Sequence, residues 1–305
     1  MRAEDPTPDQ RLPLDAAAVG RAVVRPGGLW RAVEVTAVTG STNADLLARA
    51  AAGAPEGLVL AAEEQRAGRG RMGRVWVAPP RAALTFSLLV RPDTIPPARR
   101  GWLPLLAGVA VASAVRAVAS VDARLKWPND VLAGPAKLGG ILAEAAGDTV
   151  VVGIGLNVST EPAELPPPGP NPGDPGAPGA PGSALAATSL RALASPASPA
   201  DSPSPASPAD GAFLDREALL AGILAAFERR YRAWVQADGD AERSGLRAEY
   251  TGLCATLGRR VRAELPGGQL LSGLAVGVDP DGRLLVRVSP DSAVPVAAGD
   301  VVHLR

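Results

Sequence analysis

One stretch of the chain, residues 65–76, constrains the fold more than any other. It reads Gln-Arg-Ala-Gly-Arg-Gly-Arg-Met-Gly-Arg-Val-Trp, with four arginines, three glycines and no acidic residue. Glycine lets a backbone approach a ligand closely, and the planar guanidinium group matches the oxygens of phosphates and carboxylates. A basic run is usually a solvated loop. Here the glycine spacing and the apolar segments on both sides predict a loop that binds an anionic ligand.

Two common phosphate-binding motifs fit this loop only in part. Gly68, Gly70 and Gly73 have the spacing G-x-G-x-x-G, but that dinucleotide motif must open a helix. Residues 75–80 follow instead, and Val-Trp-Val-Ala-Pro-Pro is typical of a strand that ends at prolines. A P-loop needs lysine and then serine or threonine where this chain has arginine and valine. The loop therefore belongs to a different kind of anion site.

Composition excludes several classes of protein. The formal net charge of the 305 residues is zero, which argues against a broad nucleic-acid surface. The only cysteine is Cys254 and the only histidine is His303, so no disulfide framework, Ser-His triad or histidine zinc site is expected. The start of the chain lacks a signal-peptide pattern, and its longest uncharged stretch, 102–115, is too short for a membrane span. A cytoplasmic protein without DNA or membrane contacts is predicted.

Rare residues mark the candidate functional positions. Only Lys126 and Lys137 are lysines among 31 basic residues, and the chain otherwise uses arginine. An ammonium group is compact and mobile, whereas a guanidinium group is a rigid fork, so these lysines indicate a specific use. Both lie in polar motifs, at 126–130 (Lys-Trp-Pro-Asn-Asp) and 137–140 (Lys-Leu-Gly-Gly), and three of the four asparagines lie in motifs of this kind.

The order of predicted elements indicates an α+β fold with a mixed β-sheet and helices. Strands are expected at 30–38, 57–63, 84–90, 124–132 (entering a turn), 137–144 and 150–158, and helices over 14–23, 44–52, 99–120 and 213–235. Residues 161–211 are rich in proline and lack aromatic side chains, which predicts a disordered insert in which only 184–194 could pack locally. Short strands and turns from residue 251 onwards predict a small β-barrel.

These patterns divide the chain into three parts. Residues 1–28 form an N-terminal extension, 29–250 the main α+β domain with the insert at about 161–211, and 251–305 a C-terminal domain. The start of the helix near residue 44 admits two interpretations. Ser41, Thr42 and Asn43 either cap the helix or line a polar slot for a ligand at its entrance.

Five motifs in a fixed order resemble the biotin–protein ligase family. They are Ser-Thr-Asn at 41–43, the arginine–glycine loop with Trp76, Lys-Trp-Pro-Asn-Asp at 126–130, Lys-Leu-Gly-Gly-Ile-Leu at 137–142 and Gly-Ile-Gly-Leu-Asn at 153–157. The resemblance implies a catalytic domain related to class II aminoacyl-tRNA synthetases and a C-terminal SH3-like β-barrel. It also implies that biotin and ATP, with Mg²⁺, form biotinyl-5′-AMP, and that a lysine of a carboxylase carrier domain then takes the biotin.

The resemblance also implies site residues. Lys137, Arg69 and Arg71 would be catalytic. The biotin-binding residues would be Ser41, Thr42, Asn43, Gln65, Arg69, Gly70, Arg71 and Lys137. The nucleotide-binding residues would be Arg69, Arg71, Trp76, Asn129, Asp130, Lys137 and Asn157, with Asp130 as a metal ligand. Met72 and Arg66 depart from residues common in the family, and neither belongs to these sets.

Three alternatives stay open at this point. A lipoate-type ligase shares the fold and the adenylate chemistry, but would lack the arginine–glycine loop and the motif at 126–130. A biotin-sensing transcriptional regulator would need a helix-turn-helix before residue 41, for which there is little room. An RNA-binding module is disfavoured by the neutral charge. For a ligase we expect a carrier protein or domain as partner, and a monomer or a homodimer.

Overall fold

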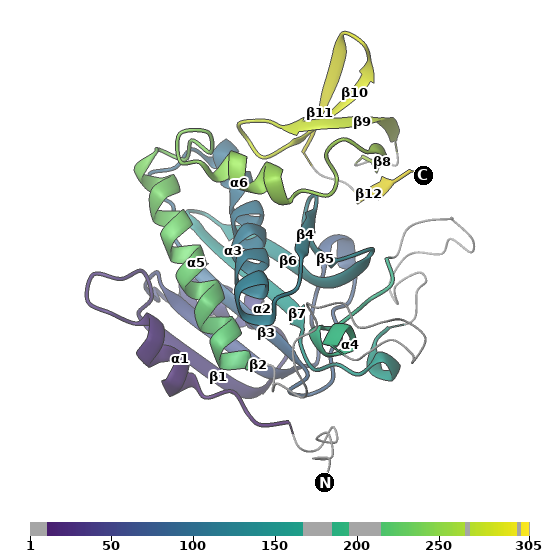
Figure 1. Cartoon of the computed structure of the whole chain (residues 1–305). Helices are drawn as coiled ribbons and strands as arrows, with labels where there is room; N and C mark the ends of the chain where they lie inside the picture. Colours follow the sequence, from purple (N-terminus) through teal and green to yellow (C-terminus); the bar gives the residue numbers. More distant parts are fainter. Residues whose placement is uncertain (1–10, 167–184, 195–214, 266–268, 298–299, 305) are drawn as a thin grey trace.

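The computed structural model describes residues 11–166, 185–194, 215–265, 269–297 and 300–304 (Figure 1). A seven-stranded mixed sheet forms the larger part, with strand order β1-β2-β3-β7-β6-β5-β4. Strands β1 and β2 pair in parallel and all the other neighbours are antiparallel, as the predicted mixed sheet requires. The strands are β1 (Ala32–Thr39), β2 (Leu58–Gln65), β3 (Ala83–Val90), β4 (Ala123–Lys126), β5 (Asp130–Ala133), β6 (Ala136–Ala146) and β7 (Thr149–Asn157).

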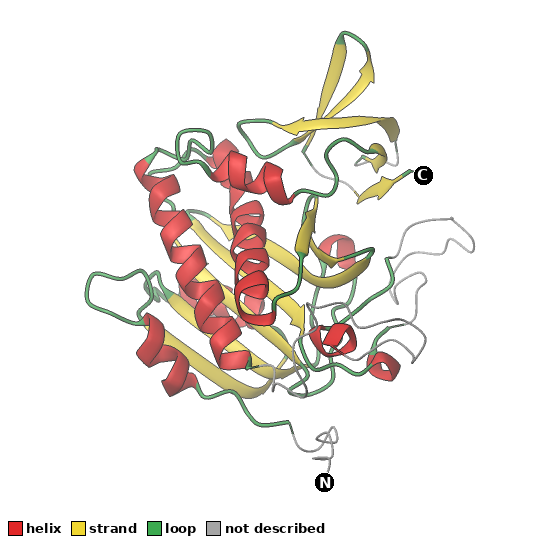
Figure 2. Ribbon diagram, in the orientation of Figure 1, coloured by secondary structure: helices red, strands yellow, loops and turns green. Residues whose placement is uncertain are grey.

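Helices cover both faces of this sheet. Figure 2 shows two long helices, α3 (Trp102–Ala119) and α5 (Arg216–Gln236), side by side on one face. Alternate residues of each strand point to opposite faces, so one strand serves two clusters. In β2, Val59 joins the large core under α3 and α5, whereas Leu60 joins a small cluster with Leu46 of α2 (Thr42–Ala51) on the other face.

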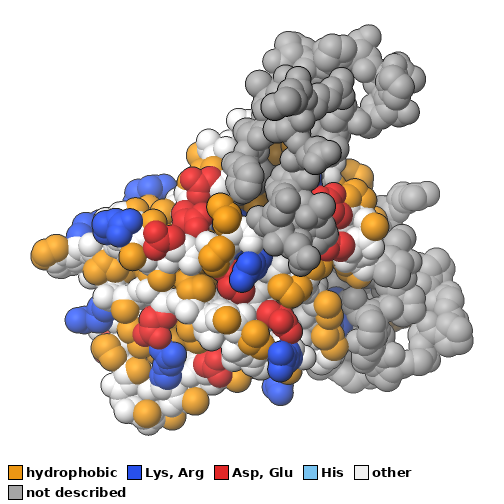
Figure 3. Space-filling model, turned by 90° about the horizontal axis from the view of Figure 1, so that it is seen from below, with side chains coloured by type: hydrophobic (Ala, Val, Ile, Leu, Met, Phe, Trp, Pro, Cys, Tyr) orange, Lys and Arg blue, Asp and Glu red, His pale blue; other side chains and the backbone are white. Residues whose placement is uncertain are grey.

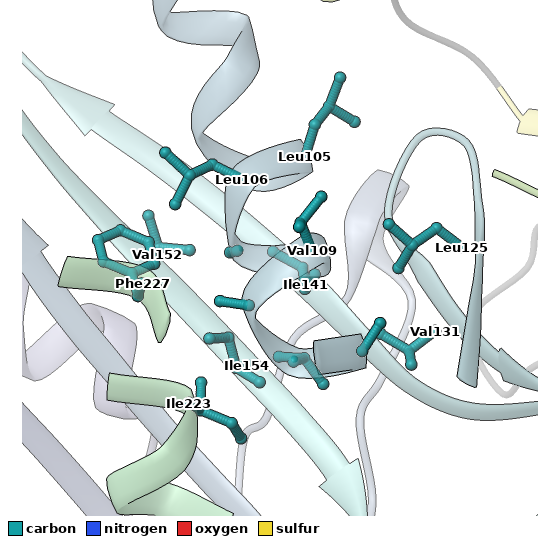
Figure 4. Close-up of a cluster of buried hydrophobic side chains, with 14 of the residues drawn as sticks. Leu105, Leu106, Val109, Leu125, Val131, Ile141, Val152, Ile154, Ile223 and Phe227 are labelled. Carbon is teal, nitrogen blue, oxygen red and sulfur yellow. The ribbon is translucent and has the colours of Figure 1, made fainter. Parts of the chain in front are cut away.

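Helix α3 is the centre of the core. Figure 4 shows Leu106 and Val109 of α3 among side chains from β6, β7 and α5, including Ile141 and Phe227. Among the described residues, one helical segment, Pro97–Ala119, has the length and apolar character of a membrane span, and 72% of its apolar window is buried inside the protein. Its hydrophobicity is therefore accounted for by the core of this fold.

The N-terminal extension packs on the catalytic domain. Helix α1 (Ala16–Val23) lies against α5 and β1, and its N-cap Asp15 accepts hydrogen bonds from two backbone N–H groups. The ion pair of Arg216 with Glu63, in which both side chains are only 8% exposed, fastens the extension. Arg216 donates to the Leu12 carbonyl, and Glu63 accepts from the Leu14 N–H. Residues 11–23 therefore contribute to the core.

The C-terminal part is an antiparallel sheet with strand order β11-β10-β9-β8-β12. Its strands are β8 (Arg260–Glu264), β9 (Leu270–Val278), β10 (Leu284–Ser289), β11 (Ser292–Val296) and β12 (Asp300–His303). The expected boundary at residue 250 falls inside α6 (Leu246–Leu253), which packs on α3 through an edge contact of Tyr250 with Trp102. The helix therefore packs with the helices of the larger sheet, and the change from the mixed sheet to the antiparallel strands comes just after it.

Two other expectations differ from the structure. Residues 75–80 do not form a strand: Val75 makes an isolated bridge to Arg69, and a short 3-10 turn, Arg71–Gly73, interrupts the loop. Part of the predicted disordered insert is ordered: a 3-10 turn, Pro162–Glu164, lies near its start, and 185–194 pack on the larger domain and include α4 (Leu190–Ala194) with a fully buried Leu190. The expected local packing of 184–194 explains this segment, while 167–184 and 195–211 lie outside the described residues.

The exterior agrees with the neutral composition. On the face shown in Figure 3, acidic and basic side chains are interspersed with apolar ones, and no single charge type gathers over a large area of the coloured surface. Such a surface gives no footprint for a polyanion on that side.

Candidate active site

A cavity of about 820 Å³ brings the five motifs together on the α2 face of the sheet. Every residue that the sequence predicted for the site lines it: Ser41, Thr42, Asn43, Gln65, Arg69, Gly70, Arg71, Trp76, Asn129, Asp130, Lys137 and Asn157. Residues of the C-terminal sheet, among them Arg262 and Val302, complete the wall. A volume of this size accommodates a ligand as large as a nucleotide conjugate.

The Ser-Thr-Asn motif both caps a helix and lines the cavity, so both interpretations hold. Ser41 is the N-cap of α2 and its hydroxyl accepts from the Ala44 N–H at 3.5 Å. Thr42 and Asn43 are buried in the first turn. Asn43 donates to a Glu144 carboxylate oxygen at 2.6 Å and to the Leu142 carbonyl at 3.2 Å. The helix start thus holds two amphoteric side chains against the sheet.

A chain of polar side chains runs behind this end of the cavity. Gln65 Oε1 lies 2.8 Å from the Thr42 backbone nitrogen and 3.0 Å from the Thr42 hydroxyl. That hydroxyl lies 2.7 Å from Ser87 Oγ, which lies 2.6 Å from Asn43 Oδ1. Ser87 is fully buried in β3, and sequence reasoning missed it along with Glu144. The only signal for Ser87 is a lone hydroxyl in the apolar run Phe-Ser-Leu-Leu-Val.

Glycines shape the loop that closes the other side. The Trp76 N–H donates to the Gly68 carbonyl at 2.9 Å, and the Gly70 N–H donates to the Arg74 carbonyl. A Cβ at Gly68 would lie 2.4 Å from the Trp76 carbonyl oxygen, and a Cβ at Gly155 would lie 2.4 Å from the Trp76 ring. Only glycine fits these two positions, so the indole packs directly on the backbone of β7.

Both lysines of the chain meet at one carboxylate. Lys137 Nζ lies 2.6 Å from Asp130 Oδ1, and Lys126 Nζ lies 3.7 Å from Asp130 Oδ2. Burial opposes ionisation of Asp130, but the two ammonium groups outweigh it and hold the pKa of the carboxyl below its usual range. Burial and the neighbouring Lys137 lower the pKa of Lys126 despite the attraction of Asp130. The cluster has two cations for one anion.

Arg71 and Asn129, two further motif residues, line the same cavity as this cluster. Arg71 donates to Asn129 Oδ1 at 3.4 Å, and Asn129 in turn donates to the Ile141 carbonyl at 3.1 Å. Burial and the charge of Arg74 lower the pKa of the Arg71 guanidinium group. Such crowding of cations inside a cavity favours an anionic ligand.

The ordered part of the insert forms one wall of the site. Lys137 pairs with residues 186–188 through two backbone hydrogen bonds of 2.8 Å, from its N–H to the Ala186 carbonyl and from the Thr188 N–H to its carbonyl. Asn157 donates its amide to the Thr188 carbonyl at 3.0 Å. The signal in the sequence that this segment packs is its short apolar run around Leu190.

The C-terminal domain holds the motif at 126–130 from the other side. The Trp127 N–H donates to Thr256 Oγ1 at 3.0 Å, and Thr256 Oγ1 lies 3.0 Å from His303 Nε2. The Trp127 indole donates to the Gly282 carbonyl at 3.1 Å. Burial, followed by the charges of Lys126 and Arg259, lowers the pKa of His303 to about 4, so the imidazole is neutral near pH 7. The only histidine of the chain therefore has a supporting position.

The described residues do not form a protein-only metal site. No group of three histidine, cysteine, aspartate or glutamate side chains converges anywhere in the part of the chain that the structure describes. Asp130, the predicted metal ligand, already pairs with two lysines. Mg²⁺ in proteins commonly keeps several waters and binds the phosphates of its nucleotide.

Two family models match the chain. The model of the biotin/lipoate A/B protein ligase family matches residues 35–159, which include all five motifs, and the model of the biotin protein ligase C-terminal domain matches residues 256–304. The second match begins just after α6, in agreement with the observed change of domain.

Curated relatives match over most of the chain. A biotin–[acetyl-CoA-carboxylase] ligase of Mycobacterium tuberculosis is 42% identical over 299 residues, which are 97% of each protein. A bifunctional ligase/repressor of Bacillus subtilis is 31% identical, over 77% of this chain and 63% of that protein.

Solved structures share the fold. A biotin protein ligase of Aquifex aeolicus in complex with biotin and ATP superposes with a TM-score of 0.65 at 23% identity, covering 90% of this chain and 98% of that one. An R40G mutant of the same ligase in complex with biotin gives a TM-score of 0.66 at 22% identity. At this identity the likeness establishes the architecture, including the C-terminal sheet.

Proposed function

This chain belongs to the biotin protein ligase family, and we propose that it is an ATP-dependent ligase that attaches biotin to a carrier protein. In the first step a biotin carboxylate oxygen attacks the α-phosphorus of ATP. The bond from that phosphorus to the bridging oxygen breaks, and pyrophosphate leaves with both electrons. In the second step the deprotonated amine of a carrier lysine attacks the carbonyl carbon of biotinyl-5′-AMP, and AMP leaves as the amide forms.

The cationic end of the cavity suits the first step. A carboxylate must approach a polyphosphate, and each pair of unit charges at about 4 Å repels by roughly 4 kcal/mol at an effective dielectric of 20. Arg69, Arg71 and Lys137 line the cavity and supply charges that offset this repulsion. Lys137 has the role of stabilising charge that develops on the carboxylate and the bridging phosphate oxygen.

The polar end suits the ring system of biotin. Ser41, Thr42, Asn43 and Gln65 gather hydroxyl and amide groups at the start of α2. A cyclic ureido group presents two N–H donors and one carbonyl acceptor, which these side chains can satisfy. Arg69 and Gly70 of the loop also line the cavity, where they could contact the biotin tail.

The remaining predicted residues line the nucleotide part. Asn129 and Asp130 present the turn between β4 and β5, Asn157 ends β7, and Trp76 offers a ring face for stacking. The Trp76 indole N–H is buried and has no partner among the described residues, so it is available to a ligand acceptor. The nucleotide would bring Mg²⁺ with its phosphates.

The acceptor would be a lysine on a biotin carboxyl carrier protein or domain. The 42% identical relative carries acetyl-CoA carboxylase in its name, and the match extends over 97% of both proteins. This supports a carboxylase carrier as the partner class.

The observation that carries this proposal is the presence of both ends in one cavity. A polar pocket at Thr42 and Gln65 and a lysine–aspartate cluster at Lys137 and Asp130 share a single volume of about 820 Å³. One molecule with a polar ring and a carboxylate can therefore bridge them. A fatty-acyl ligand such as lipoate has the carboxylate but lacks the N–H donors.

Product analysis tests the proposal. The protein is incubated with Mg·ATP and either biotin, lipoate or octanoate, and pyrophosphate release and the mass of the nucleotide product are measured. Biotin alone should release pyrophosphate and give biotinyl-AMP, and an added carrier domain should then gain the mass of one biotinyl group on lysine. Turnover with lipoate or octanoate and not with biotin would contradict the assignment.

A further inference from the structure

The chain of polar side chains from Gln65 to Asn43 has fewer hydroxyl hydrogens than oxygen–oxygen contacts. Three oxygen–oxygen contacts connect four side chains: Gln65 to Thr42 at 3.0 Å, Thr42 to Ser87 at 2.7 Å and Ser87 to Asn43 at 2.6 Å. Each hydrogen bond between two oxygens needs one hydrogen, and only the hydroxyls of Thr42 and Ser87 can supply one. Two hydrogens serve three contacts, so one contact has none.

The other hydrogen bonds of Asn43 and Gln65 show that the side-chain oxygens at both ends of this chain can only accept. The amide nitrogen of Asn43 donates to the Glu144 carboxylate and the Leu142 carbonyl, so its Oδ1 must face Ser87 as an acceptor. At the other end Gln65 Oε1 accepts from the Thr42 backbone N–H, which fixes the orientation of that amide. Both ends of the chain therefore present acceptors.

The two shorter contacts identify where the hydrogens lie. Ser87 must donate to Asn43 Oδ1, because that acceptor is only 2.6 Å away and can donate nothing. Ser87 Oγ is then an acceptor towards Thr42, whose hydroxyl donates to it across 2.7 Å. The contact without a hydrogen is the longest one, between Thr42 Oγ1 and Gln65 Oε1 at 3.0 Å.

We propose that Ser87 is a positioning residue that turns the Thr42 hydroxyl away from the cavity, so that Thr42 and Gln65 together form an acceptor site for an N–H group of the ligand. Thr42 and Gln65 line the cavity, whereas Ser87 is fully buried behind them and does not. A ligand N–H placed between the two facing oxygens supplies the missing hydrogen. A ligand oxygen or sulfur at that place would face two lone pairs. The inference rests on the proposed function, since the ureido group of biotin provides the N–H.

This arrangement distinguishes ligands of the same shape by whether they can donate a hydrogen bond between Thr42 and Gln65. A buried acceptor pair that stays unpaired costs free energy, and a ligand that cannot donate leaves it unpaired. Removing Ser87 weakens the preference, because the Thr42 hydroxyl is then free to donate to Gln65 or to a ligand oxygen.

The test compares biotin with two isosteric analogues. In each, one ureido N–H is replaced by oxygen, which gives the two cyclic carbamates. Dissociation constants are measured by calorimetry for the whole wild-type chain and for Ser87→Ala. For the isomer that places oxygen between Thr42 and Gln65, wild type should bind the carbamate at least about tenfold more weakly than biotin. In Ser87→Ala the affinity for biotin should fall about 5- to 50-fold, and the ratio between the two ligands should shrink at least about tenfold.

Ser113→Ala is the matched control. Ser113 lies on α3 on the opposite face of the sheet, where its hydroxyl accepts from Arg230 at 3.0 Å. This variant should keep the wild-type affinities and ratio. Ser87→Cys nearly conserves the side-chain volume with a weak donor and acceptor, so it replaces Ser87→Ala if that variant proves unstable, and its ratio should shrink in the same way.

The outcomes separate this inference from the proposed function. If wild type binds biotin but Ser87→Ala weakens biotin and both carbamates by the same factor, Ser87 is only structural and the inference is wrong. Unchanged affinities in Ser87→Ala would overturn it as well. If wild type does not bind biotin at all, the proposed function itself fails.

Discussion

Lys137 on β6 and Asp130 on β5 hold each other across adjacent strands, with 2.6 Å between Nζ and Oδ1. The same carboxylate also pairs with Lys126 at 3.7 Å. Both lysines of the chain therefore form ion pairs with Asp130. Lys137 is additionally held at its backbone by residues 186–188. The ammonium group of Lys137 is thus held by Asp130 and its backbone by residues 186–188, which suits the role proposed for it in stabilising transition-state charge.

Lys137→Arg should therefore lower kcat about 10- to 100-fold, because a guanidinium fork cannot occupy the place of a compact ammonium group. Adenylate formation in a single turnover would measure the step directly. Lys126→Arg is the matched control, since that side chain lies farther from Asp130 and should lose less activity. A Lys137→Arg rate within threefold of wild type would show that charge alone suffices at this position.

Thr256 is expected to support the site from the C-terminal domain. Its fully buried hydroxyl accepts from the Trp127 N–H, and this contact holds the turn that carries Asn129 and Asp130. Thr256→Val leaves that N–H unpaired and should raise the KM for ATP about 5- to 20-fold, with the affinity for biotin nearly unchanged. Thr256→Ser keeps the hydroxyl and should restore the wild-type KM. Equal losses in both variants would contradict this role, because Thr256→Ser keeps the hydroxyl that accepts from the Trp127 N–H.

His303 gives the protein a specific pH dependence. Burial and the charges of Lys126 and Arg259 hold the pKa of the imidazole at about 4 in the folded protein, against Asp130, whose charge acts in the opposite direction. The unfolded chain takes up this proton near pH 6.5. Between these values the unfolded state binds more protons, so the contribution of His303 to stability is complete above about pH 6.5 and is lost as the pH falls towards 4.

Thermal unfolding between pH 4 and 7 measures this effect. His303→Asn keeps a polar partner for Thr256 but cannot titrate, so its thermal midpoint should fall less steeply with decreasing pH than that of wild type. Identical slopes for the two proteins would assign the acid sensitivity to other groups.

The sequence allowed the residues that line the cavity to be predicted, because each of the motifs has a local chemical signature. Rare lysines, glycines in apolar strands and a basic loop without acids mark positions at which ordinary packing would use other residues. The strands and the long helices were predictable for a similar reason, since apolar spacing reflects the face that each element buries. The loop after Gly73 was not, because its backbone follows the Trp76 ring against Gly155 and forms no strand.

The rest of the site depends on contacts between distant parts of the chain. Ser87 has a role only because β3 lies beside the start of α2, and Thr256 only because β4 meets the C-terminal domain. Single-sequence patterns do not contain such pairings. The local packing of the segment 185–194 was predictable from its apolar residues, whereas its position against Lys137 and Asn157 was not.

Arg11 connects the N-terminal extension to the segment that follows Asn157. Its largely buried guanidinium group donates to the Ser159 carbonyl at 2.9 Å and to Glu164 Oε2 at 2.6 Å. Glu164 lines the cavity, and its carboxylate also accepts from the Glu161 N–H, so the segment after Asn157 is held in place by a residue outside the catalytic core. The N-terminal extension therefore contacts the segment 158–164, which we call the nucleotide wall because it follows the proposed nucleotide-binding residue Asn157.

Arg11→Ala should loosen this wall. We expect the KM for ATP to rise about 3- to 10-fold with kcat within twofold, and the stability to fall by about 1–3 kcal/mol, the usual loss for hydrogen bonds to charged groups. Steady-state kinetics and chemical unfolding of the full chain measure the two effects. Arg21→Ala on α1 removes an exposed arginine whose ion pair spans 4.0 Å, and it should change neither quantity. A kinetic effect of equal size in both variants, or a stability loss in Arg11→Ala without any change in the KM for ATP, would show that the extension supports the fold but not the nucleotide wall.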